Sequence, residues 1–584
     1  MEKTHCLPAA ILSLAMTFPA AAYTHVGAVP ENSREISVTQ PGMKEDDGRT
    51  VSVLQFGARP DDGRDDTAAL RKAAEYCRRH PGTTLTIPEG VYRLKDKEAE
   101  RLEQEVMAGN MGPNPETVIF TPYYPYVRGL DFEGAENVTV RADGAVLMCE
   151  GWMEAVSIIG CRNFRIEGLT VDYLRKPFSQ GTIVEVTPES MLVRFRDGHT
   201  LTDATPFPRL MIWDSVKNGM FRDPIYFPEH RLEGDNLVRF MVSIPEYLEG
   251  EQAAVPHSFH FRPAIYIGGS SDVVIDNVTI HSQPGMGITG FDSKNITIHG
   301  LNVCPADGYS FSTNTDATHF ACCEGSLVFD RCFFKGQGDD ATNVHGYYHD
   351  IASVSEDGWI TLELRAPTFT HSQTADVPRI GDTIEITMIT TLVPEFTATI
   401  TDVMHEEKST IVRIKTDKAL PENWKDCYIF NTSKLPSMEF SRSIVWGNLS
   451  RAVLSKTRNV RIHDNIFRGC TGTAIHVGAE SWWKEGGHGI DVSITDNVIV
   501  NCGDGAGTQY GACGIAVVID APETCGTILH DGIEISRNVI RGCPGHEGCG
   551  IAVRNARNIR IHDNIIEECA ENISTFCTEN ISIR

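Results

Sequence analysis

Three aspartates lie in one short stretch, with a spacing that could support acid–base chemistry. The segment "STNTDATHFACCEGSLVFDRCFFKGQGDDATNVHG", residues 312–346, carries Asp316 after Asn-Thr and then the adjacent pair Asp339 and Asp340. Carboxylates held close together repel each other, and this repulsion raises the pKa of one of them. The set could therefore supply both a protonated acid and an ionised base, unless these residues are ordinary polar turns.

Polar and aromatic side chains close to these aspartates, or in a later loop, could bind a neutral ligand. Six of them could bind hydroxyl groups or stack on a sugar ring: Asn314, His319, Asn343, His345, Trp482 and Trp483. A structural role in a turn, in the core or as a loop anchor remains the alternative for each. The cysteines do not have the spacing of a zinc site, and we predict no metal and no cofactor.

Charge narrows the class of ligand. The 584-residue chain has a formal net charge of −26, and its field would repel nucleic acids, anionic membranes and, more weakly, polyanionic substrates. The first 22 residues contain a short apolar run followed by "PAAA", which indicates a signal peptide and export to the periplasm or the cell exterior. The apolar run is too short for a membrane span, and no later segment is apolar for long enough.

The elements that must position the aspartates are indicated by a repeat in the last third of the chain. Four segments alternate apolar and polar residues, then place an Asn five positions before a Cys: "NVRIHDNIFRGC", "DVSITDNVIVNC", "GIEISRNVIRGC" and "NIRIHDNIIEEC". The alternation predicts a strand in each, the Asn suits a left-handed turn, and the Cys would fill space inside as a small apolar residue.

Short strands repeating at such intervals predict an all-β fold, a right-handed parallel β-helix, because each coil buries its inner face only by stacking on the next. A leucine-rich horseshoe is the alternative, but its helices and its leucine frame are missing. Near the start, Asp66 and Thr67 begin a predicted helix with one apolar face, which would close the end of the solenoid as an N-terminal helical cap. A coil of about 23 residues would place Asp316 and Asp339 on neighbouring coils.

Two regions lack the repeat and predict β-barrel-like insertions. The resulting organisation is a signal peptide (1–22), a polar lead-in (23–50), the cap and first coils (51–173), one insertion (174–262), central coils with the active site (263–346), a second insertion (347–440) and C-terminal coils (441–584).

At the aspartates the chain resembles two families. "NTD" followed one coil later by "DD" is similar to the polygalacturonases, whereas the longer pattern, from the cap through "NTDATHF" and "GQGDDATNVHG", resembles exported bacterial α-1,3-galactosidases acting on blood-group-B-type glycans. The second resemblance implies an inverting, metal-independent exo-glycosidase, with Asp339 as general acid and Asp316 and Asp340 as candidate bases. The polygalacturonase motifs Gly-His-Gly and Arg-Ile-Lys occur here in reversed order, at 487–489 and 413–415, which indicates an accidental match. A neutral sugar also fits the acidic protein better.

Three classes of function are therefore expected, in descending order. The first is a hydrolase of terminal α-galactoside glycans, with no nucleic-acid partner and no membrane span, and with a homodimer left open. The second is a polygalacturonase or polysaccharide lyase on the same scaffold. The third is a glycan-binding adhesin without catalysis.

Overall fold

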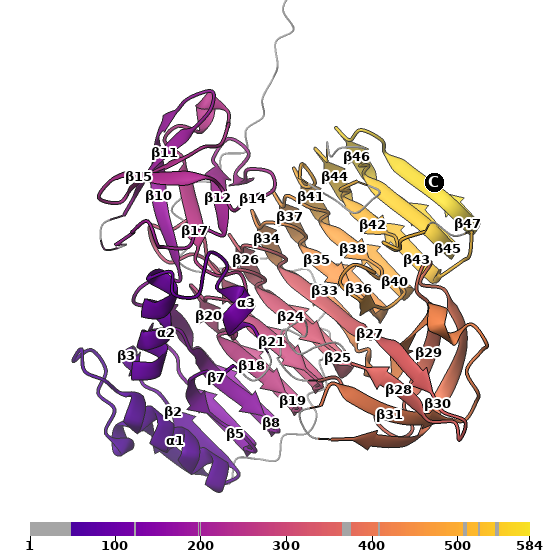
Figure 1. The fold of residues 1–584 in the computed structure, drawn as a ribbon, viewed down its shortest axis with the longest axis horizontal. Helices are drawn as coiled ribbons and strands as arrows, with labels where there is room; N and C mark the ends of the chain where they lie inside the picture. The colour runs from indigo at the N-terminus through magenta and orange to yellow at the C-terminus, as the bar shows by residue number, and fades with distance from the viewer. Residues whose placement is uncertain are drawn as a thin grey trace, which may run out of the picture. The chain divides into compact units, whose positions relative to one another are not determined.

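The structure is a computed structural model that describes residues 48–121, 124–196, 198, 200–364, 375–406, 409–505, 511–523, 526–543 and 548–584. The predicted signal peptide, nearly all of the predicted lead-in and Cys525 lie outside the described residues. Within the described part, strands predominate, and their parallel pairing forms a β-helix with three ladders (Figure 1). The right-handed sense of the coil stays a prediction.

The first ladder carries the candidate site and is called the site ladder below. Its strands are β4 (Arg128–Asp131), β7 (Glu154–Ile159), β18 (Ile265–Gly268), β21 (Ile288–Phe291), β24 (Thr318–Ala321), β27 (Thr342–Val354), β35 (Val453–Ser455), β38 (Ile475–Val477), β42 (Ile515–Val517) and β45 (Ile551–His562).

The second ladder runs beside it with the same parallel pairing. Its strands are β1 (Arg49–Ser52), β2 (Thr83–Thr86), β5 (Glu136–Arg141), β8 (Arg162–Glu167), β19 (Ser271–Asp276), β22 (Lys294–His299), β25 (Glu324–Asp330), β33 (Ser437–Ser441), β36 (Arg458–His463), β40 (Ile490–Thr495) and β43 (His530–Ser536), followed by the long strands β45 and β47 (Ile573–Ile583).

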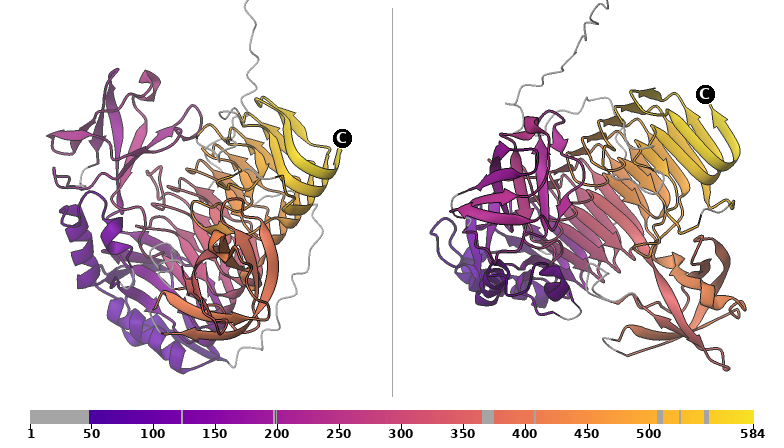
Figure 2. Two further views of the ribbon diagram at one scale, coloured as in Figure 1. Left: turned by 45° about the vertical axis from the view of Figure 1, so that its right-hand side comes forward. Right: turned by 45° about the horizontal axis from the view of Figure 1, so that its top comes forward.

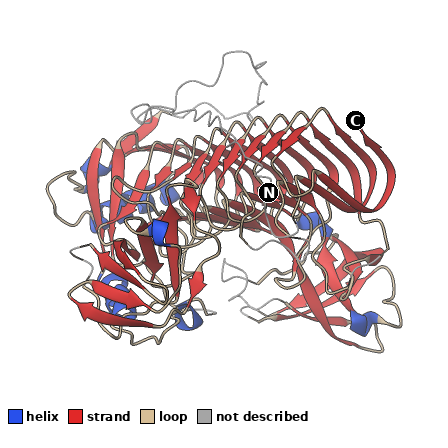
Figure 3. Cartoon of the chain, turned by 90° about the horizontal axis from the view of Figure 1, so that it is seen from above, coloured by secondary structure: helices blue, strands red, loops and turns tan. Residues whose placement is uncertain are grey.

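The third ladder is a separate sheet. Its strands are β3 (Gly90–Lys95), β6 (Ala145–Glu150), β9 (Thr170–Tyr173), β20 (Thr279–Ile280), β23 (Asn302–Val303), β26 (Phe333–Lys335), β34 (Ile444–Trp446), β37 (Ile466–Arg468), β41 (Val498–Val500), β44 (Val539–Arg541) and β46 (Ile565–Glu567). Figure 3 shows the strands of successive coils lying side by side in this stack.

One apolar core runs through the coils, and the predicted alternation explains it. In β36 the side chains of Val460 and Ile462 are buried while Arg461 between them is exposed. Ladders of isoleucine, valine and phenylalanine thus stack inward from coil to coil. The repeat cysteines Cys470, Cys502 and Cys543 are also fully buried, and no described cysteine is in a disulfide.

The prediction of a left-handed asparagine in each repeat was wrong by one residue. The residues with positive φ are the preceding ones, for example Asp464 with φ of 57° and Asp496 with φ of 59°. The asparagines themselves form an internal hydrogen-bonded stack, in which Asn465 Nδ2 donates to Asn497 Oδ1 at 3.0 Å. Because a side-chain amide has both N–H donors and a carbonyl acceptor, each buried asparagine can form hydrogen bonds with the coil before it and with the coil after it.

Helices are few and lie near the start of the described chain: α1 (Thr67–Arg79), α2 (Lys97–Met107) and α3 (Glu116–Ile119). The predicted helix is α1, and its buried face contains Leu70, Ala73, Ala74 and Cys77 as expected. That α1 serves as a cap for the solenoid stays a prediction. Among the described residues, no helix is both long and apolar enough to cross a membrane.

Antiparallel strands replace the repeat in the two predicted insertions (Figure 2). The first contains β10 (Phe178–Val186), β11 (Met191–Phe195), β12 (Arg209–Asp214), β13 (Gly219–Met220), β14 (Ile225–Tyr226), β15 (His230–Gly234), β16 (Leu237–Phe240) and β17 (Gln252–Pro256). Their pairing is an open path in the order β13-β12-β17-β10-β11-β16-β15, with β14 paired to β12 beside it.

In the second insertion the pairings run in a ring. Strand β27 continues out of the coil and pairs with two strands of a set that comprises β28 (Ile360–Glu363), β29 (Thr383–Met388), β30 (Pro394–His405), β31 (Ile411–Thr416) and β32 (Cys427–Asn431). Each insertion has its own apolar cluster. A short strand, β39 (Glu485–Gly486), returns to pair with β27 beside the coils.

Candidate active site

The three aspartates converge at the start of two adjacent strands of the site ladder. Asp316 precedes β24, and Asp339 and Asp340 precede β27. The register pairs Thr318 with Thr342, which confirms that Asp316 and Asp339 lie on neighbouring coils and places Asp340 directly beside Asp316. The main-chain N–H of Ala317 donates to the carbonyl of Asp340 at 3.0 Å. One carboxylate oxygen from each aspartate lies within 4.8 Å of the others.

Arg451 binds the carboxylate of Asp340. It precedes β35, whose Val453 is paired with Thr342, so the next coil places Arg451 over Asp340. Its Nε donates to Oδ1 at 2.9 Å and its Nη2 to Oδ2 at 2.8 Å. Burial nevertheless raises the pKa of Asp340 to about 6, with the arginine opposing that rise. At neutral pH Asp340 is therefore an anion with both oxygens occupied.

Arg451 also belongs to a buried row of alternating charges. Its Nη1 lies 3.0 Å from Glu480 Oε1, and Lys456 Nζ lies 2.7 Å from Glu480 Oε2. The same ammonium group, which is fully buried, binds Glu485. Burial alone would raise the pKa of Glu480, but Arg451 and Lys456 lower it to about 2. Buried charges persist only when paired in this way.

Two histidines connect Asp316 to the main chain. His319 Nδ1 lies 2.7 Å from Asp316 Oδ2, and its Nε2 lies 2.7 Å from Nε2 of His345. The other nitrogen of His345, Nδ1, lies 3.0 Å from the carbonyl oxygen of Gly346. All three side chains are buried, and burial lowers the pKa of His319 to about 4 and that of His345 to about 3.

The hydrogen bonds that run from Gly346 through the two histidines to Asp316 determine which of their atoms carry a proton. The carbonyl of Gly346 can only accept, so Nδ1 of His345 carries the hydrogen and its Nε2 is an acceptor. His319 must then donate through Nε2, which leaves its own Nδ1 as an acceptor facing Asp316. Asp316 must therefore donate, and its carboxyl is protonated. Burial and the charge of Asp340 raise the pKa of Asp316 well above its usual value, which agrees with this assignment.

Asp339 is the least buried of the three aspartates, and burial raises its pKa as well. Groups from the first insertion approach it. The charge of Arg209 acts on Asp339, and Tyr226 interacts with both. His260 faces Asp316 and Asp339 from the end of the same insertion, and its Nδ1 lies 3.1 Å from Glu116 Oε2. Glu116 raises the pKa of His260 against the effect of burial.

The six predicted binding residues differ in where the structure places them. Asn314 is fully buried and donates to the carbonyl of Ser258 at 2.9 Å, so it attaches the first insertion to the coil. Asn343 donates to Glu485 at 3.1 Å. The histidines His319 and His345 form the proton chain described above. These four lie within the network around the aspartates.

The tryptophan pair lies on a turn beside the charged row. Trp482 is 84% exposed and Trp483 is 46% exposed, between Glu480 and Glu485. Their rings project into solvent, while the flanking glutamates point inward to Lys456. The loop was predicted to bind sugar through its aromatic residues, whereas the groups that reach the site network are its two carboxylates, Glu480 and Glu485, which were not predicted.

Two groups of donor atoms are close enough to hold a cation: the three aspartates, and His319, His345 and Glu485. In both groups the atoms that could ligate a cation already bind a positively charged side chain or form a hydrogen bond within the protein. Arg451 occupies Asp340, the proton chain occupies Asp316 and His319, and Lys456 occupies Glu485. We therefore propose no metal at either group.

No family model matches the chain. Curated proteins do match: the chain is 26% identical over 503 residues to Alpha-1,3-galactosidase A of Bacteroides fragilis (strain YCH46), covering 81% of this chain and 80% of that protein. It is 25% identical over 476 residues to Alpha-1,3-galactosidase B of Parabacteroides distasonis, with 74% of each chain covered.

Solved structures with a similar course of the chain include an exopolygalacturonase from Thermotoga maritima, at 12% identity and a TM-score of 0.40, covering 91% of this chain and 92% of that one. They also include PfbA, a surface adhesin of Streptococcus pneumoniae, at 12% identity and a TM-score of 0.38, covering 91% and 93%. These scores are too low to support a shared function. The sequence similarity is therefore the informative one: over about four fifths of its length, this chain is similar to proteins named alpha-1,3-galactosidases, which supports a glycosidase.

Proposed function

We propose that the protein is an exo-acting glycoside hydrolase that releases terminal α-1,3-linked galactose from blood-group-B-type or related neutral glycans, with inversion at the anomeric carbon. The observation that carries this proposal is the set of three carboxyl groups that converge at one point and are held by different partners. Asp316 is a neutral acid held by His319, and Asp340 is an anion held by Arg451. The similarity to named galactosidases supports the choice of sugar.

The proposed roles follow from how each carboxyl group is held. Asp339, which has a raised pKa and is the least enclosed, protonates the glycosidic oxygen as the C1–O bond breaks. Asp340 orients a water molecule and takes its proton as the new C1–O bond forms. Asp316 stays neutral, and it limits the negative charge gathered around Asp340. This assignment narrows the two candidate bases to Asp340.

The spacing of the carboxylates would not by itself indicate inversion. Most inverting glycosidases separate the two carboxyl groups by about 6.5–9.5 Å, and oxygens of the three aspartates here lie closer than that. The resemblance to inverting enzymes supports a direct attack by water instead. Oδ2 of Asp340 accepts a hydrogen bond from Nη2 of Arg451 and keeps a second lone pair, which can take the proton of the attacking water.

A panel of substrates tests the function. The purified protein is incubated with terminal α-1,3-, α-1,4- and α-1,6-galactosides and with polygalacturonate, and the released sugars are identified. We expect galactose from the α-1,3-linked substrates only. Shortened polygalacturonate would indicate a polygalacturonase, an unsaturated product would indicate a lyase, and binding without turnover would indicate an adhesin.

We also propose that the protein is exported. The apolar run near the start of the sequence, followed by the small residues "PAAA", supports this. Expression of the full chain in a Gram-negative host, followed by fractionation and N-terminal sequencing, should yield a mature form that begins after Ala22. A cytoplasmic protein with an intact N-terminus would contradict export.

A further inference from the structure

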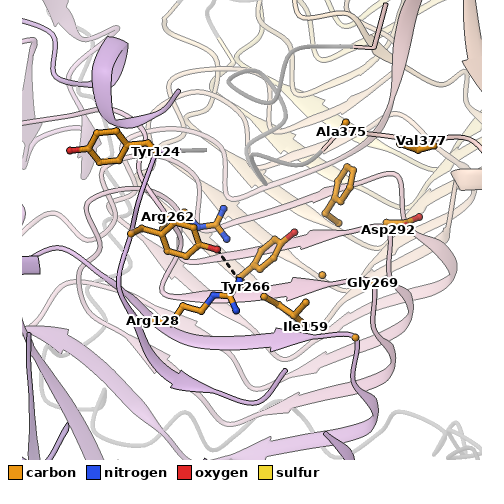
Figure 4. Close-up of a pocket in the computed structure, with 13 residues that line it drawn as sticks. Tyr124, Arg128, Ile159, Arg262, Tyr266, Gly269, Asp292, Ala375 and Val377 are labelled. Atoms are coloured by element: carbon orange, nitrogen blue, oxygen red, sulfur yellow. Dashed lines mark hydrogen bonds between the residues drawn. The ribbon is translucent and has the colours of Figure 1, made fainter. Parts of the chain in front are cut away.

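A cavity lies on the outer face of the site ladder, toward the start of the chain. It has a volume of about 570 Å³, and the residues that line it include Tyr126, Arg128, Arg262, Tyr266, Phe291 and Asp292. Figure 4 shows Arg128, Arg262 and Tyr266 meeting there from separate elements of the chain. Tyr266 and Phe291 form the buried floor, on strands β18 and β21.

The cavity combines flat rings with planar hydrogen-bond donors. The guanidinium carbon of Arg262 lies 4.3 Å from the centroid of the Tyr126 ring and 4.5 Å from that of Tyr266. Arg128 donates from Nη2 to the hydroxyl of Tyr126 at 3.2 Å. Rings that offer an apolar face, beside donors held in fixed directions, suit a ligand with C–H faces and many hydroxyls.

The charges around the cavity are balanced by neighbouring residues, which argues for a neutral ligand. Arg262 binds Glu154 with its Nε 2.7 Å from Oε2, and both side chains are buried. Arg128 lies 3.0 Å from Glu133 and 3.3 Å from Asp131. On the other side of the cavity, Asp292 lies 2.5 Å from Arg379 and 3.2 Å from Lys434.

The cavity and the catalytic aspartates share one surface. The register of the site ladder runs from Tyr266 to Thr289 and then to His319, so two strand spacings, about 10 Å, separate the cavity floor from the proton chain. The segment before β18 also connects the two places, because His260 faces Asp316 whereas Arg262, two residues later, lines the cavity.

A buried hydroxyl lies between the cavity and the catalytic residues. Thr289 is 3% exposed, and its Oγ1 has no hydrogen-bond partner among the described residues. A buried hydroxyl without a partner costs free energy, and a ligand hydroxyl that spans this position would supply the missing bond.

We infer that this cavity binds a neutral sugar unit of the glycan whose terminal galactose is cleaved, on the far side of the scissile bond. The inference rests on the proposed function and extends it. The enzyme then recognises two parts of its substrate: the terminal galactose at the aspartates, and an inner sugar in the cavity lined by Tyr126, Arg128 and Tyr266. A simple galactoside would use only the first of these.

The test compares two substrates on one variant. Tyr126→Ala removes an aromatic wall that lies outside the strands. We expect kcat/KM for an oligosaccharide that extends beyond the terminal disaccharide to fall about three- to tenfold, and the loss for an aryl α-galactoside to be clearly smaller. The control Phe576→Ala removes a half-exposed aromatic ring from β47, far along the chain, and should change neither value. Equal losses on both substrates, or no loss on the oligosaccharide, would overturn the inference.

A binding experiment separates failure of the inference from failure of the proposed function. If the wild-type protein cleaves no galactoside, isothermal titration calorimetry with the same neutral oligosaccharide still measures whether the cavity binds sugar. Binding that Tyr126→Ala weakens would support the cavity as a sugar site even without hydrolysis. Absence of binding, or a preference for a sialylated or sulfated glycan over the neutral one, would overturn it.

Discussion

Arg451 holds the carboxylate of Asp340 through three donors: its main-chain N–H at 2.7 Å, Nε at 2.9 Å and Nη2 at 2.8 Å. The two residues are 111 positions apart in sequence, and the site ladder places them on adjacent coils. The arginine opposes the effect of burial on the pKa of Asp340, which is about 6. The anion that the proposed mechanism requires therefore depends on Arg451.

A variant of Arg451 should move the pH profile. In the wild type, kcat/KM should fall as the pH drops below about 6, because Asp340 becomes protonated and loses its function as a base. In Arg451→Gln the cation is gone, and we expect this acid limb to move up by about one pH unit or more. Kinetics from pH 4 to 9 measure the shift. Arg537→Gln, at an exposed ion pair with Asp496, is the control and should leave the profile in place.

Asp316 should tolerate replacement by asparagine better than its neighbour does. The amide that Asp316→Asn introduces can donate to His319 Nδ1 just as a protonated carboxyl does, so this variant should lose less than about tenfold in kcat/KM. Asp340→Asn removes the base and should lose about 10²–10⁴-fold. The two variants are compared on the same galactoside. If both lose activity equally, Asp316 is ionised in the active enzyme and the proton assignment is wrong.

The position of the aspartates could be predicted from sequence because it depends on strand period. The alternation on either side of "NTD" and "GQGDD" locates strands, and strands one coil apart must be neighbours in a β-helix. The period does not fix register to a single residue, so the sequence placed Asp316 and Asp339 on neighbouring coils but could not show which aspartate of the pair lies directly beside Asp316. The histidines were found because they belong to the same two strands.

Arg451, Lys456 and Glu485 could not be found in the same way. The second insertion separates them from Asp340 by about a hundred residues, so nothing local in the sequence signals that they return to the same coil edge. These three charged residues do not recur at a fixed spacing that would form a sequence motif, because each lies in a different segment of the chain. The stacked asparagines were assigned to turns because a turn residue and a residue of a buried ladder both recur once per coil, so spacing alone does not distinguish them.

The buried charged row should matter for stability as well as for activity. Glu480→Gln leaves Arg451 paired with Asp340 and Lys456 paired with Glu485, so it weakens two charge-assisted hydrogen bonds without isolating a cation, and we expect a loss of about 1.5–3 kcal/mol in the free energy of unfolding. The matched control Asp496→Asn breaks an exposed ion pair and should cost at most about 1 kcal/mol. Urea denaturation at pH 7 measures both. Similar losses in the two variants would show that the row does not stabilise the fold.

Reducing agents should leave the fold unchanged. The described cysteines are unbridged, and those in the repeats fill the interior of the coils. Loss of a native disulfide would cost about 2–5 kcal/mol, which would appear as a clear drop in Tm. We expect equal Tm values with and without dithiothreitol. A lower Tm in reductant would mean that some cysteines pair in the exported protein.

The most direct test of the central claim is proton NMR of the first product formed from Gal-α-1,3-Gal, recorded before mutarotation. We expect the β-galactose anomeric signal to appear first with the wild type. We also expect Asp339→Asn to lose about 10²–10⁴-fold on this disaccharide but far less on an activated aryl α-galactoside, whose leaving group needs little protonation. Release of α-galactose first would contradict direct attack by water, and full activity of Asp339→Asn would show that Asp339 is not the general acid.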